Sequence, residues 1–87
     1  MPRVTFFTKP DCGLCNAAMY VIERVRRWVP FEFESIDITA PGQEKWLDRY
    51  REHIPVVHLN GREVFRHRVD EKELRRLLGS AGATDQR

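Results

Sequence analysis

The sequence predicts an α/β protein with a central four-stranded mixed sheet and three helices, in the order β-α-β-α-β-β-α. Two observations carry most of this prediction. Residues 4–7 form a strand-like run, which is followed by a long helical pattern and then by a second strand-like run. This β-α-β order favours a parallel strand pair with a right-handed crossover. Later, Asn60-Gly61 separates two more strand-like runs. This pair is a strong hairpin signal, because a type I′ turn needs two residues that tolerate positive φ.

The first strand and the first helix have clear patterns. Residues 4–7, Val-Thr-Phe-Phe, are β-branched or aromatic throughout, which suits an interior strand covered on both faces. A helix is then expected from Gly13 to Trp28, ending before Pro30. Its apolar residues recur at helical spacing: Leu14, Ala17, Ala18, Val21, Ile22, Val25 and Trp28. One side of this helix should therefore face the core.

The middle of the chain predicts a second strand and a short helix. Residues 31–34, Phe-Glu-Phe-Glu, alternate as a strand does, but the apolar parity changes at Ser35. A β-bulge or the end of the strand is expected there. The segment from about Gln43 to Arg51 has one apolar face and charged remaining positions. It should form a helix on the surface of the sheet.

The last third of the chain predicts a hairpin and a final helix. Residues 56–59, Val-Val-His-Leu, form the third strand, and Val64 lies on the return strand. Asp70 and Glu73 have the spacing of an N-cap and capping-box pair, so a helix should begin there. Gly79 is expected to end that helix.

Length, composition and charge limit the number of domains and the kinds of partner that the chain can have. With 87 residues, 41% apolar and 32% charged, the chain suits one domain over residues 1–79, followed by a disordered tail at 80–87. A net charge of +2 gives no reason to expect a nucleic-acid partner. No apolar run approaches the roughly 20 residues that cross a bilayer, so no membrane association is expected. Without an export signal, a cytoplasmic location is expected. A monomer is also expected.

The chemistry-bearing feature is the pair Cys12 and Cys15, the only cysteines, at the start of the first predicted helix. Residues three apart in a helical turn face the same way, close enough for a disulfide. Free N–H groups at a helix start favour a thiolate, so the pKa of the Cys12 thiol is expected below its ordinary value of about 8.5. Lys9 acts in the same direction, whereas the adjacent Asp11 opposes it. In a reducing compartment such a pair is more often catalytic or metal-binding than structural. A zinc site would need two further ligands, so no metal is expected.

Three segments carry a family resemblance. They are residues 8–15, Thr-Lys-Pro-Asp-Cys-Gly-Leu-Cys, residues 54–57, Ile-Pro-Val-Val, and the Asn60-Gly61 hairpin. With this element order, the chain resembles the thioredoxin superfamily and, within it, the small glutaredoxin-like proteins. The resemblance extends from Val4 to about Leu78 and implies a thioredoxin-like fold.

The resemblance also implies a function and a site. It suggests a thiol–disulfide oxidoreductase in which Cys12 is the nucleophile and Cys15 resolves the mixed disulfide. Its partners would be protein or small-molecule disulfides and an external thiol reductant, with glutathione as a co-substrate candidate. Pro55 matches the family's cis-proline, which lies against the cysteine pair, and the backbone of Ile54 would face the bound thiol. Lys9 matches the glutaredoxin lysine that binds a glutathione carboxylate.

One segment departs from the glutaredoxin pattern. Glutaredoxins usually carry Gly-Gly before the last helix, where the backbone approaches glutathione, whereas this chain has Arg66-His67-Arg68. Lys9, the Ile54 backbone and the helix start at Asp70 would then be the remaining binding elements, and weak glutathione binding is expected. Two alternatives stay open. One is a glutathione-dependent [2Fe-2S] cluster carrier, and the other is a redox-inactive binding module of the same fold.

Overall fold

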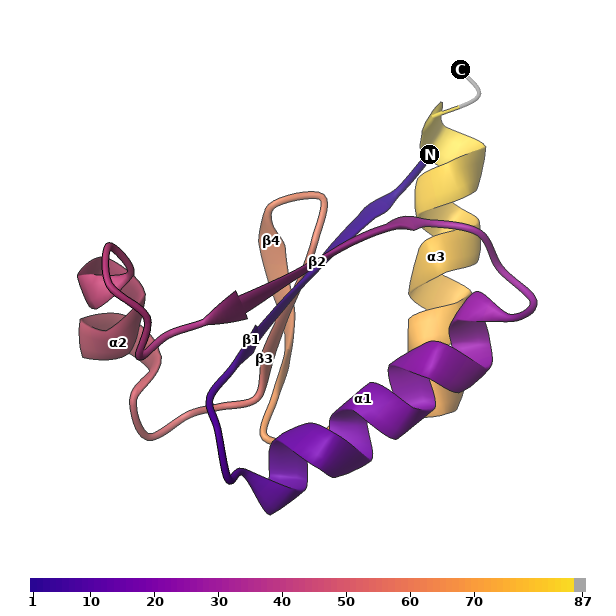
Figure 1. Ribbon diagram of the computed structural model, residues 1–87. Coiled ribbons are helices and arrows are strands. Elements are labelled where there is room, and N and C mark those ends of the chain that lie inside the picture. Colours follow the sequence, from indigo (N-terminus) through magenta and orange to yellow (C-terminus); the bar gives the residue numbers. More distant parts are fainter. Residues whose placement is uncertain (86–87) are drawn as a thin grey trace.

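The computed structural model describes the backbone of residues 1–85 and the side chains of residues 1–81 (Figure 1). The elements follow the predicted order β-α-β-α-β-β-α. Their bounds are β1 Arg3–Thr8, α1 Gly13–Arg26, β2 Glu32–Asp37, α2 Glu44–Tyr50, β3 Val56–Leu59, β4 Arg62–Arg66 and α3 Glu71–Asp85. Within the described residues, no helix has the length and apolar character that crossing a membrane requires.

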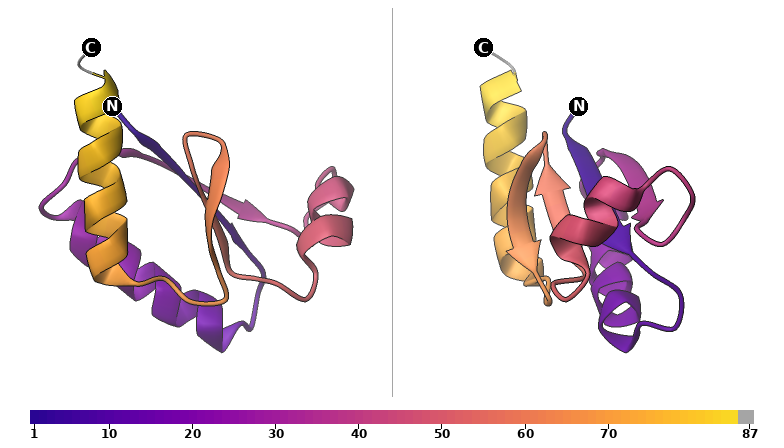
Figure 2. Two further views of the ribbon diagram at one scale, coloured as in Figure 1. Left: turned by 180° about the vertical axis from the view of Figure 1, so that it is seen from behind. Right: turned by 90° about the vertical axis from the view of Figure 1, so that its left-hand side faces the viewer.

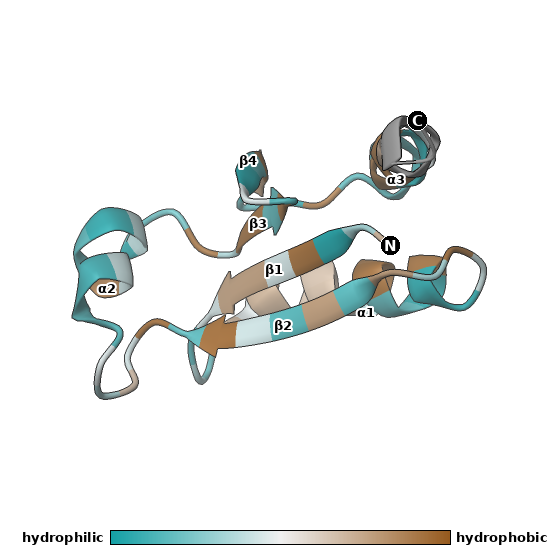
Figure 3. Ribbon diagram, turned by 90° about the horizontal axis from the view of Figure 1, so that it is seen from above, coloured by the Kyte–Doolittle hydropathy of each residue, from teal (hydrophilic) through white to brown (hydrophobic). Residues whose placement is uncertain are grey.

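The four strands form one mixed sheet in the order β2-β1-β3-β4. β1 pairs parallel with β2 and antiparallel with β3, which confirms the predicted parallel pair and the interior position of the first strand. α1 and α3 lie against each other on one face of the sheet, and α2 lies on the other (Figures 1 and 2). In the view from above, α2 and α3 lie on opposite sides of the strands (Figure 3).

The two faces of β1 supply much of the core. Phe6 lies on the face toward α1, where its ring is 6.4 Å from that of Phe33. Phe7 lies on the opposite face, with its ring 4.6 Å from Trp46 and 5.2 Å from Tyr50 of α2. Because both faces of β1 are covered, the uninterrupted apolar pattern of this strand is explained.

The expected bulge or strand end at Ser35 is wrong. β2 continues in unbroken register with β1 through this point, with Phe6 opposite Ser35 and Phe7 opposite Ile36. The apolar parity changes because different helices cover the two ends of β2. Phe33 lies under α1, where Arg26 stacks on its ring, whereas Ile36 shares the face of Phe7, which α2 covers.

The hairpin prediction is confirmed. Asn60 has φ 52° and Gly61 has φ 83°, as both central residues of a type I′ turn require. The Asn60 side chain also accepts a hydrogen bond from the backbone N–H of Arg3 at 2.9 Å. The turn is thereby tied to the beginning of β1.

The predicted start of the last helix is confirmed, but its predicted end is wrong. The Asp70 carboxylate accepts a hydrogen bond from the backbone N–H of Glu73 at 2.9 Å, as an N-cap does. α3 then continues through Gly79 to Asp85, and residues 86–87 lie outside the described residues, so the disordered tail at 80–87 stays a prediction. A glycine inside a helix costs only about 1 kcal/mol relative to alanine, and Ala81 packs against the core beyond it.

Candidate functional site

The cysteine pair occupies the first turn of α1. Cys12 is the N-cap residue, with extended backbone at φ −118° and ψ 103°, and its Sγ accepts a hydrogen bond from the backbone N–H of Cys15 at 3.2 Å. Its carbonyl oxygen accepts the N–H of Asn16 at 3.1 Å, which is the first intrahelical bond. A donor at the helix start therefore points at the sulfur of Cys12, where it would stabilise a thiolate.

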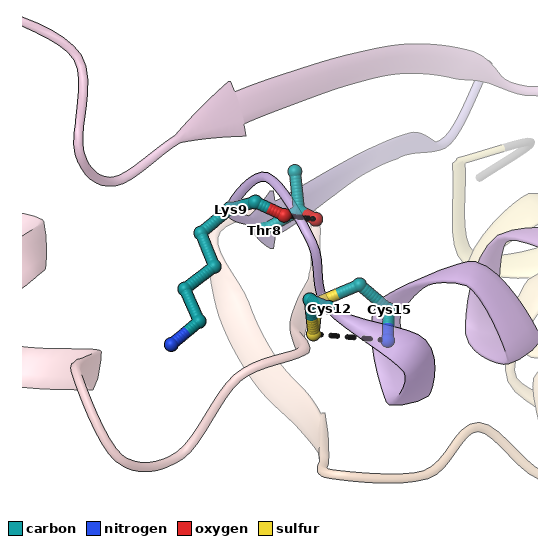
Figure 4. Close-up of a disulfide and its surroundings, with 4 residues drawn as sticks. All are labelled: Thr8, Lys9, Cys12 and Cys15. Carbon is teal, nitrogen blue, oxygen red and sulfur yellow. Dashed lines mark hydrogen bonds between the residues drawn. A yellow bond between two sulfur atoms is a disulfide. The ribbon is translucent and has the colours of Figure 1, made fainter.

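Cys12 and Cys15 are joined by a disulfide, with their Cα atoms 5.2 Å apart (Figure 4). Cys15 is 2% exposed and belongs to the hydrophobic core, whereas Cys12 is only partly buried. An incoming disulfide can therefore reach Cys12 and not Cys15. The roles of Cys12 as nucleophile and Cys15 as resolving residue stay predictions.

The two charged residues before Cys12 lie on the surface. Lys9 is exposed, and Figure 4 shows its side chain directed away from the two sulfur atoms. Asp11 is also exposed and has φ 57°, a left-handed conformation that aspartate tolerates better than most residues. Neither residue forms an ion pair within the described part of the chain, so both charges are available to an incoming ligand.

Ile54 and Pro55 precede β3, and both are buried. The peptide bond between them is cis. The carbonyl oxygen of Pro55 accepts a hydrogen bond from the backbone N–H of His67 at 2.7 Å. This bond joins the segment before β3 to the segment that follows β4, two parts of the chain that are both expected to border the site.

The backbone conformation of His67 was not predicted from the sequence. Its φ is 71°, which is unusual for a residue other than glycine, and the next N–H, that of Arg68, turns back to the carbonyl of Arg66 at 2.8 Å. The centre of its ring lies 5.9 Å from the centre of the His53 ring. Its Nε2 atom lies 3.4 Å from the carbonyl oxygen of Glu52. A signal for this conformation was present, since glutaredoxins place glycine in this stretch and glycine accepts positive φ freely.

A small groove lies beside the cysteine pair. One wall comes from α1 and includes Leu14, Ala17 and Val21, and the other comes from the segment before α3. That second wall is formed by His67, Arg68 and Val69, and the groove has a volume of about 210 Å³. Leu14 is one of the two residues between the cysteines and is 45% exposed, so the α1 wall of the groove begins within the Cys-Gly-Leu-Cys segment.

Asp70 stabilises the first turn of α3. Its carboxylate caps α3, and its carbonyl oxygen accepts the N–H of Leu74 at 2.9 Å. The predicted role of Asp70 in substrate binding therefore stays a prediction. Among the described residues, no three His, Cys, Asp or Glu side chains come together in a way that could hold a metal ion.

A second polar cluster lies on the α2 face of the sheet. The hydroxyl of Tyr50 is 2.9 Å from Nε2 of His58 and 3.4 Å from Glu63, which lies opposite His58 as expected for the hairpin. Burial lowers the pKa of His58 and raises the pKa of Tyr50. The hydrogen bond from Arg66 holds the pKa of the Glu63 carboxyl below its ordinary value. Arg66 is therefore engaged by Glu63, at 2.7 Å, and differs in this respect from Arg68.

The fold and the redox pair together define a class. A thioredoxin-like fold with a disulfide at the start of its first helix supports a redox thiol–disulfide role and suggests an oxidoreductase. A family model described as Glutaredoxin-like domain (DUF836) matches residues 3–79, and the chain therefore belongs to the glutaredoxin-like family of the thioredoxin superfamily.

Individual relatives agree with this assignment. The chain is 33% identical over 76 residues to a protein of Dictyostelium discoideum called glutaredoxin-like protein YDR286C homolog, covering 83% of this chain and 70% of that protein. An X-ray structure of protein XcR50 from X. campestris is similar with a TM-score of 0.71 and 26% identity, over 88% of this chain and 96% of that one. Thioredoxin O2 from Arabidopsis thaliana in its oxidized state shares the fold, with a TM-score of 0.66 and 21% identity, over 92% of this chain and 74% of the other.

Proposed function

We propose that the protein is a thiol–disulfide oxidoreductase that uses the Cys-Gly-Leu-Cys pair, with Cys12 as nucleophile and Cys15 as resolving residue. The observation that carries the proposal is the difference between the two sulfurs. Cys12 is accessible and accepts an N–H at the helix start, whereas Cys15 is buried behind it.

The proposed reaction has two exchange steps. The thiolate of Cys12 attacks one sulfur of a substrate disulfide, a bond forms between them, and the other substrate sulfur leaves as a thiolate that takes a proton from solvent. Cys15 then loses its proton and attacks the Sγ of Cys12, which releases the second substrate thiolate. The substrate gains two electrons, and the protein is left with the Cys12–Cys15 disulfide. An external dithiol, or two molecules of a monothiol such as glutathione, returns the two electrons.

The polar surroundings support substrate capture next to Cys12. Lys9 and Arg68 have no ion-pair partner within the described part of the chain, and they add positive charge to the surface around the pair. These cations would attract acidic disulfides toward the surface near the pair, whereas the exposed Asp11 beside Cys12 opposes negative charge locally.

The test is disulfide reduction by the wild-type protein and by two single-cysteine variants. The reduced wild-type protein should reduce a small neutral disulfide catalytically when a dithiol is supplied. Cys15→Ser should accumulate a mixed disulfide at position 12, identified by peptide mass, whereas Cys12→Ser should form none. Failure of the wild-type protein to reduce any disulfide would overturn the proposal and favour a passive binding module. Visible absorption of a bound cluster after anaerobic purification would instead favour the iron–sulfur carrier.

A further inference from the structure

α1 has more apolar residues on one side than the hydrophobic core buries. Ala18, Ile22 and Val25 are fully buried against the sheet and α3. Leu14, Ala17 and Val21 lie on the adjoining strip of the helix at a spacing of three and four residues, and all three retain exposure to solvent. This strip forms one wall of the groove beside the cysteines. Its apolar side chains thus have a surface that no residue of the described chain fully covers.

The opposite wall combines an apolar residue with a free cation. Val69 is partly buried and packs against the core, and Arg68 beside it is exposed. Arg68 forms no ion pair within the described residues, in contrast to Arg66, which is bound by Glu63. The groove therefore offers an apolar floor with one positive charge at its rim.

The size of the groove restricts its occupant. A volume of about 210 Å³ is several times the roughly 30 Å³ share of one water molecule. It is also below the range of about 300–1,000 Å³ that is usual for pockets holding whole small molecules. One aliphatic or aromatic side chain with its flanking backbone fits this volume better than a cofactor does.

We propose that this groove selects the substrate of the redox pair: a polypeptide disulfide whose cysteine is followed or preceded by an apolar residue and then by an acidic one. The apolar side chain would lie between Leu14, Ala17 and Val69, and the acidic group would pair with Arg68. Because Leu14 lines the groove and follows Cys12 by two residues, an occupant of the groove would bring its neighbouring sulfur close to Cys12. Glutathione has no apolar side chain for this groove, so it is the poorer substrate. This inference rests on the proposed oxidoreductase function.

The test uses four peptides in single-turnover reactions with the reduced full-length chain. Each peptide carries one cysteine joined to the same coloured aromatic thiol, so attack by Cys12 on the peptide sulfur releases that thiol and leaves the peptide on the protein. The four peptides combine Leu or Ser directly after the cysteine with Glu or Lys one position further, and the set of four is repeated with these residues before the cysteine. The Leu–Glu peptide should react about tenfold faster than the Ser–Glu peptide and about threefold to tenfold faster than the Leu–Lys peptide.

Variants then assign the preference to the groove. Arg68→Glu should reverse the order of the Leu–Glu and Leu–Lys peptides, whereas Arg27→Glu, the same charge change at an exposed position of the chain outside the groove, should leave it unchanged. Ala17→Phe should fill the groove and reduce the Leu–Glu rate to that of Ser–Glu. A small neutral disulfide serves as the reference substrate, and each peptide rate is divided by the rate of the same variant with this disulfide.

Two results would overturn the inference. Equal rates for all four peptides, with normal reduction of the small disulfide, would show that the redox function is right and the groove does not select substrates. No reaction with any disulfide, including the small one, would overturn the oxidoreductase function and the substrate class together.

Discussion

The backbone N–H of His67 donates a hydrogen bond to the carbonyl oxygen of Pro55 at 2.7 Å. His67 reaches this position with φ 71°, and its neighbour Arg68 lines the groove beside the cysteine pair. A single backbone bond thus connects the segment before β3 with the segment before α3. The left-handed backbone of His67 is part of this connection. Its effect on stability can be separated from that of the imidazole by comparing two substitutions at this position.

Substitution of His67 by glycine should give a more stable protein than substitution by alanine. Both changes remove the imidazole, but a left-handed conformation costs a residue with a Cβ about 1–2 kcal/mol, so the glycine variant should be more stable by about 1 kcal/mol. Urea unfolding of the oxidised proteins measures the difference. The same pair at Glu23, an exposed position inside α1, should show the opposite order. An alanine variant at 67 as stable as the glycine variant would contradict the observed backbone conformation.

The two cysteines should react with an alkylating reagent at different pH. In the reduced protein, Cys12 should be modified at lower pH than Cys15, because Cys12 lies at the helix start with an N–H directed at its sulfur and Cys15 is buried. Alkylation at graded pH, followed by peptide mass analysis, measures both. The single-cysteine variants Cys12→Ser and Cys15→Ser provide the controls. Earlier modification of Cys15 would show that the assignment of nucleophile and resolving residue is reversed.

Loss of the Asp70 cap should destabilise the protein. Asp70→Ala removes the acceptor for the N–H of Glu73 and should lower the free energy of unfolding by about 1 kcal/mol, whereas Asp70→Asn retains an acceptor and should change it little. Urea unfolding compares the three proteins. If Asp70→Ala is as stable as the wild-type protein, the cap contributes nothing to α3.

Stability should decrease with falling pH in a window set by His58. Burial lowers the pKa of His58 in the folded protein below its ordinary value of 6.5, so the unfolded chain binds a proton more readily than the folded chain between these two values. The contribution of His58 to the free energy of unfolding is therefore fully present above about pH 6.5. It is lost as the pH falls through the lower pKa of the folded state. The lowered pKa of Glu63 acts separately, below its ordinary value of 4.5.

Thermal or urea unfolding at graded pH measures this window. His58→Gln, which removes the titrating imidazole, should flatten the slope below pH 6.5. An unchanged slope in His58→Gln would mean that another group causes the pH dependence.

Glutathione should bind weakly and through electrostatic attraction. The chain has Arg66-His67-Arg68 where glutaredoxins have the glycine pair, so we expect the backbone approach to glutathione to be hindered and Lys9 to be the main contact for a carboxylate. Calorimetric titration of the alkylated protein should show binding that weakens with salt and falls about threefold to tenfold in Lys9→Ala. Lys45→Ala, at an exposed position on α2, is the matched control. Tight binding that is insensitive to salt and to Lys9→Ala would show an ordinary glutaredoxin pocket.

The sequence alone determined the features that depend on neighbouring residues. The Asn60-Gly61 turn, the Asp70 cap and the first turn of α1 with its cysteine pair each follow from local sterics and hydrogen bonds within a few residues. The uninterrupted run at residues 4–7 likewise predicted a strand covered on both faces. Together with the element order, these signals were sufficient for the fold and for the redox pair.

The tertiary structure decided what depends on residues far apart in the chain. Whether β2 breaks at Ser35 depends on which helix covers each end of that strand, and whether α3 ends at Gly79 depends on the core available to Ala81. The left-handed turn at His67 follows from a hydrogen bond to Pro55, twelve positions earlier, and the groove needs α1 and the segment before α3 side by side. The energies of such contacts are set by packing and pairing between distant segments, which no short sequence pattern specifies.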